Sequence, residues 1–402
     1  MTTAISRIAV ATALAATPAL AQDPVVQGDK NVPEFEPAFE NQTRAPAMSS
    51  DFELDVSTLA GPLVHPWGIA VLPDDAGYLV TERPGRLRHV APDGTLSEPL
   101  GGVPEVLNEE QGGLLDVALG PDFGESRRIF LTYAKPMGDG MSATAAASAT
   151  LSEDLRQISD VQDIFVQEPP SPSPMHYGSR IVFDGEGHAF ITTGEHFTED
   201  QRVYAQDLDK TYGKIIRVNL DGSVPEGNPF VGQEGAIDSI WAYGLRNVQA
   251  AAYEDGQLWT ISHGPAGGDE LNEIQPGLNY GWPVIAYGEN YDGTPVGSGE
   301  SKMEGMEQPV YYWDPVIAPS GMVFYDGEMF SEWQGDILVG SLYPGALVRL
   351  RLEDGRVAGE ERLLRDIGRV RDVEDLEDGS LLIITDEENG ALLHVTRAGQ
   401  SN

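Results

Sequence analysis

Short runs of alternating β-type residues recur along the chain, each followed or flanked by a turn that contains Asp or Gly and then by a second β-type run. Six such units occupy residues 69–82, 117–133, 181–194, 250–261, 322–340 and 373–386. Each unit predicts a β-hairpin, because Asp and Gly tolerate the positive φ angles of a tight turn. The units recur about every 45 to 75 residues, the spacing of four-stranded propeller blades with loops. The pattern predicts an all-β fold, a six-bladed β-propeller; a β-sandwich of unrelated hairpins is the alternative.

The first residues follow a different pattern. Arg7 precedes an apolar stretch, residues 8–16, and a small-residue cleavage motif ends at Ala21. Residues 1–21 are therefore expected to be a cleaved signal peptide, which implies a periplasmic or secreted protein. The apolar stretch is too short to span a bilayer, so we expect a soluble protein with no stable membrane anchor. Residues 22–50, which contain four prolines, predict an extended arm or linker, and residues 51–402 the propeller.

Composition narrows the partners that suit this fold. The 402 residues include 64 Asp and Glu against 25 Lys and Arg, which gives a formal net charge of −39. Nucleic acids and anionic membrane surfaces attract clusters of Lys and Arg, so neither is expected as a partner. The absence of cysteine from the sequence excludes disulfides, thiolate nucleophiles and cysteine-ligated metal clusters.

Polar clusters beside the hairpins are the candidates for chemistry, since loops on a rigid scaffold carry functional groups. His176 is the candidate general base, because imidazole titrates nearest to neutral pH. On residue type alone, a structural or exposed histidine explains this position better. Arg246 beside Asn247 suits either an anionic ligand or a structural salt bridge. Arg369 and Arg371 would share one face of a strand, which favours an anionic ligand, with surface ion pairs as the alternative.

The loop 264–270 offers oxygen atoms to a metal. Its Gly-Pro turn provides the backbone carbonyls of Gly264 and Pro265, and Asp269 and Glu270 add two carboxylates. Oxygen donors of this kind suit calcium rather than zinc or copper. The sequence contains no dinucleotide fingerprint, phosphate-binding loop, zinc-protease motif or serine-hydrolase elbow.

Together, these clusters resemble the soluble pyrroloquinoline quinone (PQQ) dehydrogenases of the glucose/sorbosone dehydrogenase family, in particular the bacterial aldose sugar dehydrogenases. The resemblance runs from about Pro66 to Val395. The segments that carry it are 65–68, 81–85, 111–116, 176–180, 208–217, 246–247, 264–272, 279–283 and 318–321. Any one of these segments would be weak, but their number and order identify the family.

The resemblance implies a propeller that holds PQQ above its central channel. His176 would remove the proton of the sugar C1 hydroxyl while hydride passes to the quinone. Gln111 and Arg246 would lie beside the substrate and quinone oxygens, and Arg246 would stabilise charge as the quinone is reduced. The residues expected to bind the carboxylates and carbonyls of PQQ are Asn247, Arg369 and Arg371.

The resemblance also implies two calcium sites. The backbone carbonyls of Gly264 and Pro265 would ligate the catalytic Ca²⁺, which bridges protein and cofactor. Glu270, with Tyr280 nearby, would belong to a second, structural Ca²⁺ site.

Two positions depart from the family pattern. Met175 stands where well-characterised members carry an Asp directly before the base, so an orienting carboxylate must come from elsewhere or be absent. The segment 341–345, which contains Tyr343, replaces a loop in which some members place a PQQ-binding Lys. Losing that ammonium removes one charge partner of PQQ.

The leading hypothesis is a periplasmic dehydrogenase that uses PQQ and Ca²⁺ to oxidise aldoses at C1 to lactones. An external electron acceptor, a quinone or a cytochrome, would reoxidise the cofactor. Two other functions stay open: a calcium-dependent, lactonase-like hydrolase and a non-catalytic propeller that binds a sugar or a quinone. The sequence does not identify the physiological sugar.

Overall fold

A computed structural model describes residues 23–399 of the protein. The expected signal peptide, residues 1–21, lies outside the described residues. Within the described range the secondary structure is almost entirely β. The helices there are short: α1 (Phe123–Ser126), α2 (Glu199–Arg202), η1 (Val203–Gln206) and η2 (Ser331–Trp333). No helix among the described residues is long and apolar enough to cross a membrane.

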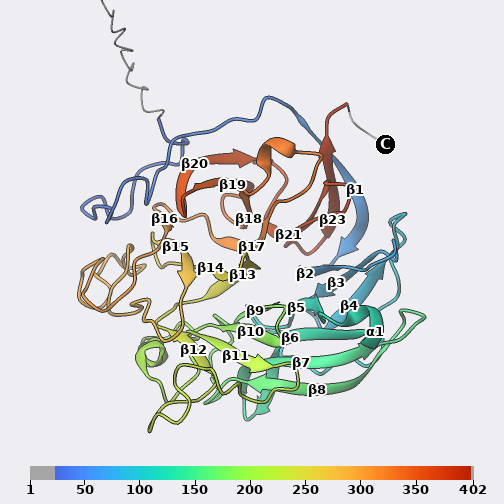
Figure 1. Cartoon of the computed structure of the whole chain (residues 1–402), viewed down its shortest axis with the longest axis horizontal. Coiled ribbons are helices and arrows are strands. Elements are labelled where there is room, and N and C mark those ends of the chain that lie inside the picture. Colours follow the sequence, from blue (N-terminus) through green and yellow to red (C-terminus); the bar gives the residue numbers. More distant parts are fainter. Residues whose placement is uncertain (1–22, 400–402) are drawn as a thin grey trace, which may run out of the picture.

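The strands form six antiparallel sheets arranged around a centre (Figure 1). The first sheet has three strands, β2 (Pro66–Val71), β3 (Tyr78–Glu82) and β4 (Arg86–Val90). The second contains β5 (Leu114–Leu119), β6 (Arg128–Gly138), β7 (Met141–Leu151) and β8 (Ile158–Val166). The third contains β9 (Gly178–Phe183), β10 (His188–Thr193), β11 (Lys214–Asn219) and β12 (Ile240–Tyr243).

The other three sheets have four strands each. The fourth contains β13 (Val248–Glu254), β14 (Gln257–Ser262), β15 (Asp269–Ile274) and β16 (Tyr311–Trp313). The fifth contains β17 (Pro319–Phe324), β18 (Ile337–Ser341), β19 (Ala346–Glu353) and β20 (Arg356–Leu363). The sixth contains β21 (Val370–Asp375), β22 (Leu381–Thr385), β23 (Gly390–Arg397) and β1 (Leu54–Leu63).

The prediction of an all-β, six-bladed propeller is confirmed. Each predicted hairpin coincides with the first two strands of one blade, from β2–β3 to β21–β22. The first strands, β2, β5, β9, β13, β17 and β21, are the inner strands, and each contacts the inner strands of its two neighbouring blades. They lie around the centre of Figure 1. The inner hairpins have the clearest sequence pattern because they are packed on both faces.

The ring is closed by strands from the two ends of the described chain. β1 pairs antiparallel with β23, so that Leu54 lies opposite Arg397 and Val56 opposite Val395. This pairing lies at the upper right of Figure 1. The sixth blade therefore consists of three C-terminal strands and one N-terminal strand.

The hydrophobic core lies between neighbouring blades. Leu79 and Leu87 of the first blade pack with Leu114, Leu131 and Ala147 of the second, and all five are fully buried. Small residues on β7 let the sheets approach closely, which keeps the inner strands in fixed positions. A fixed ring of inner strands is what a precise site at their ends requires.

Residues 23–50, expected to form an extended arm or linker, pack along the outside of the fourth and fifth blades. Ala47 bridges Glu360 of β20 in parallel, and the Ala45 amide donates to the Tyr311 hydroxyl at 3.0 Å. Gln42 is fully buried, and its side-chain amide donates to the Pro309 carbonyl at 2.9 Å. These contacts hold the segment against the propeller.

Candidate functional site

A cavity of about 300 Å³ lies where the inner strands begin. All six blades contribute to its wall, because the chain enters each of the six inner strands from this end. The residues that line it include Trp67, Arg83, Gln111, Leu115, Tyr177, Asn247, Gln249, His263, Ala318, Leu342, Arg369, Arg371 and Asp386. We call this space the upper cavity. Gln111, Asn247, Arg369 and Arg371, predicted separately from sequence, come together here.

His176 lies two residues before the start of β9 and is 4% exposed. Its backbone N–H donates to Gln111 Oε1 at 2.9 Å, which connects it to the upper cavity. Its Nδ1 lies 3.2 Å from Glu195 Oε1, and Glu195 is fully buried. Glu195 also accepts the backbone N–H of Phe197. These contacts fix the orientation of the imidazole ring, as in other pairs of a base with an orienting carboxylate.

The charges around His176 favour its neutral form. Burial lowers the pKa of His176, and the nearby Arg246 guanidinium lowers it further, against the opposing effect of Glu195. Burial alone would raise the pKa of Glu195, but His176 and Arg246 outweigh it, so that this pKa is lowered. An ionised Glu195 accepts the proton of Nδ1, which leaves the Nε2 lone pair to act as a base.

The local backbone makes this pair possible. His176 has φ = 49°, a left-handed conformation that is uncommon outside glycine. Its carbonyl packs against Gly194, where an added Cβ would lie 1.9 Å from the His176 oxygen. Glycine at 194 therefore lets the His176 segment approach the end of β10, and the next residue is Glu195. Strained backbone held by its surroundings is a common feature of functional sites.

Arg246 connects the base to the loop 264–270. It is 5% exposed, and its Nη1 donates to the Gly264 carbonyl at 2.7 Å. Its Nε lies 3.8 Å from Glu195 Oε1, too far for a hydrogen bond, and is buried without a partner among the described residues. The guanidinium also lies 5.2 Å from the centre of the Trp282 ring. The Nε atom of Arg246 is thus available to donate a hydrogen bond to a bound group.

A second cavity, of about 340 Å³, is lined by Glu195 and Arg246. The rest of its wall consists of aromatic side chains (Phe197, Trp282 and Tyr291), polar or charged side chains (Thr198, Glu199, Arg202, Asn290 and Asp292) and Pro265. We call it the side cavity. His176 contacts Gln111 of the upper cavity and Glu195 of the side cavity, so it links the walls of the two spaces.

Three guanidinium groups, those of Arg83, Arg369 and Arg371, line the upper cavity beside the carboxylates of Glu110 and Asp386. Arg371 is buried, and its Nη2 donates to Asp386 Oδ2 at 2.6 Å. Arg369 is partly exposed, and its Nη2 lies 3.6 Å from the same oxygen. Burial would raise the pKa of Asp386, but Arg371 above all, with Arg83 and the hydrogen bond to His65, holds it well below its usual range. The Nε atoms of Arg83 and Arg371 are buried without a hydrogen-bond partner among the described residues, which leaves donors for an anion.

The four residues predicted to bind metal lie around one small void. Gly264, Pro265, Glu270 and Tyr280 all line this void of about 10 Å³, together with Arg246. A space of about 10–15 Å³ holds one water-sized particle. Burial, with the neighbouring Asp269 carboxylate adding to its effect, raises the pKa of the Glu270 carboxyl to about 8. The Tyr280 hydroxyl already donates to Glu273 O and accepts from the Gln275 amide, both at 2.8 Å, so only its backbone is free for a metal.

Side-chain ligands alone do not make a metal centre in the part of the chain that the structure describes. No group of three or more His, Cys, Asp or Glu residues there has a suitable geometry. A cation at the void would therefore depend on backbone carbonyls such as those of Gly264 and Pro265.

Comparison with known proteins decides the family. The model of the family described as glucose/sorbosone dehydrogenase matches residues 63–394, nearly the whole propeller. The chain belongs to the glucose/sorbosone dehydrogenase family. The dehydrogenase class expected from the sequence is thereby confirmed.

Several bacterial proteins resemble this dehydrogenase in sequence and structure. The chain is 44% identical over 347 residues to an aldose sugar dehydrogenase of Escherichia coli K12, covering 85% of this chain and 93% of the relative. The crystal structure of the apo-form of the soluble E. coli aldose sugar dehydrogenase superposes with a TM-score of 0.82 at 43% identity, covering 86% of this chain and 99% of that one. The PQQ-bound aldose sugar dehydrogenase of Streptomyces coelicolor gives a TM-score of 0.71 at 27% identity, with coverages of 87% and 100%.

The structure shows what surrounds the two positions that depart from the family pattern. Met175 carries no charge, and the carboxylate beside the candidate base His176 is Glu195, 19 positions after His176. Tyr343 is 67% exposed. Arg83, for which no role was predicted, provides a further guanidinium at the upper cavity.

Residues of the site that the sequence analysis missed include Trp67, Arg83, Glu195, Gln249 and Asp386. Glu195 carried one usable signal, since a carboxylate directly after a buried strand end lies in a favoured position for function. Trp67 and Arg83 belong to segments that carry the family resemblance, 65–68 and 81–85.

Proposed function

We propose that this protein is a PQQ- and calcium-dependent aldose dehydrogenase that oxidises sugars at C1 to lactones. The observation that carries the proposal is the His176–Glu195 pair beside a cavity bordered by arginines with unpaired Nε atoms. PQQ is a tricarboxylate, and planar guanidinium groups match carboxylates in geometry and charge. The PQQ-bound Streptomyces relative supports this cofactor.

The residues present fit the cofactor. Arg83, Arg369 and Arg371 would face its carboxylates from the upper cavity, and Asn247 would add an amide from the start of β13. Bound PQQ supplies an acceptor for the hydride of the sugar. Gln111 borders both this space and His176, so it would lie beside the reacting oxygens.

The aldose would occupy the side cavity, where aromatic faces can pack against the C–H groups of a sugar ring and polar side chains can bond its hydroxyls. His176 Nε2 would take the proton of the C1 hydroxyl, while Glu195 holds the Nδ1 proton and stabilises the imidazolium. Arg246, fixed by the Gly264 carbonyl, would stabilise the negative charge that develops at the reacting oxygens.

The decisive experiment is reconstitution of the protein with PQQ and Ca²⁺, followed by dye reduction with a panel of aldoses. We expect reduction with at least one aldose and a change in the absorption spectrum of PQQ on binding. If the PQQ spectrum did not change and no aldose reduced the dye, the dehydrogenase proposal would be refuted. Hydrolysis of a lactone without added quinone would instead favour the lactonase-like alternative.

Glu195→Gln is expected to change both the rate and its pH dependence. Glu195 raises the pKa of His176, while burial and Arg246 lower it. Loss of this carboxylate therefore moves the acidic limb of kcat/KM to lower pH and reduces kcat by about tenfold or more, since the ring is no longer held in one tautomer. The measurement is kcat/KM between pH 4 and pH 8. An acidic limb that does not move would show that Glu195 does not act on the base.

Calcium is expected to stabilise the protein through Glu270. A cation in the void would neutralise a buried carboxylate, and binding to the folded state alone raises Tm. Glu270→Gln should abolish the rise in Tm that Ca²⁺ produces in the wild type. Glu273→Gln, on the same strand β15, is the matched control and should keep it. Equal calcium responses in all three proteins would remove Glu270 from the metal site.

The location and the acceptor form part of the same proposal. Residues 1–21 have the composition of a signal peptide, which supports export to the periplasm. An exported dehydrogenase would pass its electrons to an external quinone or cytochrome.

A further inference from the structure

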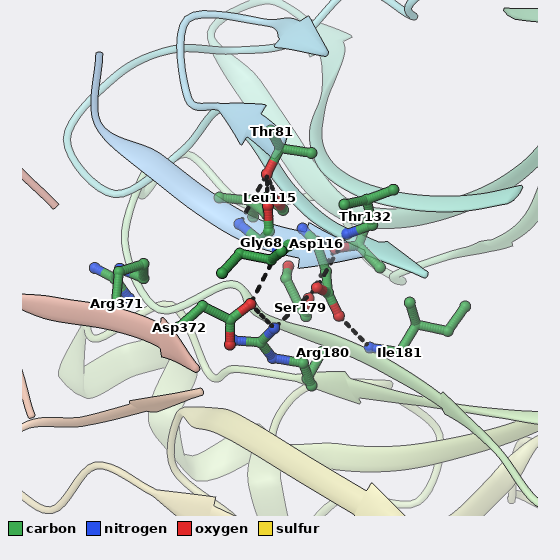
Figure 2. Close-up of polar contacts among 12 residues, drawn as sticks. Gly68, Thr81, Leu115, Asp116, Thr132, Ser179, Arg180, Ile181, Arg371 and Asp372 are labelled. Carbon is green, nitrogen blue, oxygen red and sulfur yellow. Dashed lines mark hydrogen bonds and ion pairs between the residues drawn. The ribbon is translucent and has the colours of Figure 1, made fainter. Parts of the chain in front are cut away.

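A buried arginine stands in the central channel, below the floor of the upper cavity. Arg180 of β9 is 6% exposed. Its Nη1 donates to Asp116 Oδ1 of β5 at 2.9 Å and to Asp372 Oδ2 of β21 at 3.1 Å. Figure 2 shows this group, which we call the channel triad, with both carboxylates directed at the guanidinium. The proposed mechanism does not use it.

The triad connects five of the six inner strands. Besides β9, β5 and β21, it reaches β13, because Arg180 Nε donates to the Gln249 carbonyl at 3.3 Å. It reaches β2 because Asp372 Oδ2 also accepts the Ile69 amide at 3.1 Å. Gly321 leaves room for Asp372, since a Cβ there would lie 1.7 Å from Asp372 Oδ1.

The triad also separates two spaces. Its three members line a lower cavity of about 460 Å³, bounded by the later residues of the inner strands, such as Val71 and Phe183. The upper cavity begins at the other end of the same strands. The triad and Trp67 thus lie between the proposed cofactor site and the lower channel.

Two contacts connect the triad to residues of the upper cavity. The Arg180 guanidinium lies 4.5 Å from the centre of the Trp67 ring, and that of Arg371 lies 5.6 Å from it. Gln249 accepts from Arg180 through its backbone and from Arg371 Nη1 through Oε1 at 3.0 Å. Its side-chain amide donates to Asn247 Oδ1 at 3.2 Å. Displacement of Arg180 would disturb Trp67 and two of the proposed PQQ ligands, Arg371 and Asn247.

We propose that Arg180 is a positioning residue for the quinone cofactor, and that the channel triad sets the affinity and the reduction potential of the bound quinone. The inference rests on the proposed function. A positive charge below the floor attracts the PQQ carboxylates and stabilises the negative charge that reduction adds, whereas Asp116 and Asp372 oppose it. Such effects are strong in a buried site, where water screens little.

The test compares two substitutions that change the triad charge in opposite directions. Arg180→Met removes a positive charge, and we expect about tenfold weaker PQQ binding, the scale of one charge-assisted interaction, with a more negative midpoint potential. Asp372→Asn removes a negative charge and can keep both hydrogen bonds, because they use Oδ2 alone. We expect tighter PQQ binding and a more positive potential. The readouts are a binding titration with Ca²⁺ and a redox titration of bound PQQ.

Arg349→Met is the matched control. Arg349 is 2% exposed, is held between Asp336 and Glu361, and lies 5.5 Å from the centre of the Trp333 ring, far from the upper cavity in the fifth blade. The substitution should lower Tm but leave the PQQ affinity and the midpoint potential of bound PQQ unchanged.

Shifts of the same sign in the Arg180 and Asp372 variants would show a merely structural triad and overturn the inference. An Arg180→Met protein with wild-type affinity and potential would also overturn it. If Arg180→Met does not fold, Asp372→Asn decides: a positive shift supports the inference and an unchanged potential refutes it. Failure of the wild type to bind PQQ would refute the proposed function itself, and the inference with it.

Discussion

Replacement of His176 by alanine is expected to lower kcat by at least about a hundredfold, the usual contribution of a positioned general base. No other histidine of the described chain combines an ionised carboxylate on one ring nitrogen with contacts to the walls of both cavities. The measurement is kcat of the PQQ- and Ca²⁺-loaded variant with the best aldose of the panel. PQQ affinity should change little, since His176 does not belong to the arginine-lined wall.

His188→Ala is the matched control for this prediction. His188 also pairs with a carboxylate, its Nδ1 lying 2.6 Å from Asp184 Oδ2, but it stands at the opposite end of the hairpin β9–β10. Its removal should leave kcat unchanged. A His176→Ala enzyme that turns over at the wild-type rate would exclude His176 as the base.

Replacement of Arg246 by methionine is expected to lower kcat by about a hundredfold to a thousandfold, the cost of losing a preorganised donor to a developing negative charge. Methionine fills similar volume over Trp282, so the fold should persist. Removal of the guanidinium also takes a positive charge from beside His176, and the pKa of the base should rise toward its ordinary value. Steady-state kinetics at saturating PQQ measure the first effect, and the pH profile measures the second.

Arg217→Met controls for the loss of a stacked guanidinium. Arg217 lies 4.8 Å from the centre of the Trp241 ring in the third blade, away from both cavities. It should show wild-type kcat. If Arg246→Met retained a kcat within about threefold of the wild type, Arg246 would have no part in stabilising the transition state.

The inner hairpins could be predicted because their pattern is local. Units such as 181–194 contain both strands and the turn between them, so a short window of sequence determines the element. The closing strand β1 could not be predicted in this way. Leu54 pairs with Arg397 from the far end of the chain, and no local pattern encodes such a partner.

The site was predictable as a set of residues but not as an arrangement. The sequence singled out His176, Gln111 and Arg246 as candidates, each just before an inner strand. The carboxylate partner of His176 is Glu195, whose proximity depends on the approach of Gly194 to the His176 carbonyl. The channel triad is harder still to predict from the sequence, since Arg180 bonds carboxylates that lie 64 and 192 positions away along the chain. Such contacts arise from ring closure, not from local sequence.

The pairing of β1 with β23 has a consequence for the order in which the protein folds and binds its cofactor. The wall of the upper cavity contains Trp67 from the first inner strand and Arg371 from the last. The sheet that carries Arg371 is complete only when β1 has paired with β23, which ends at Arg397. A nascent chain therefore cannot complete this sheet before its last strand has emerged, and the proposed quinone cofactor would be loaded into a finished ring rather than enclosed as the ring forms.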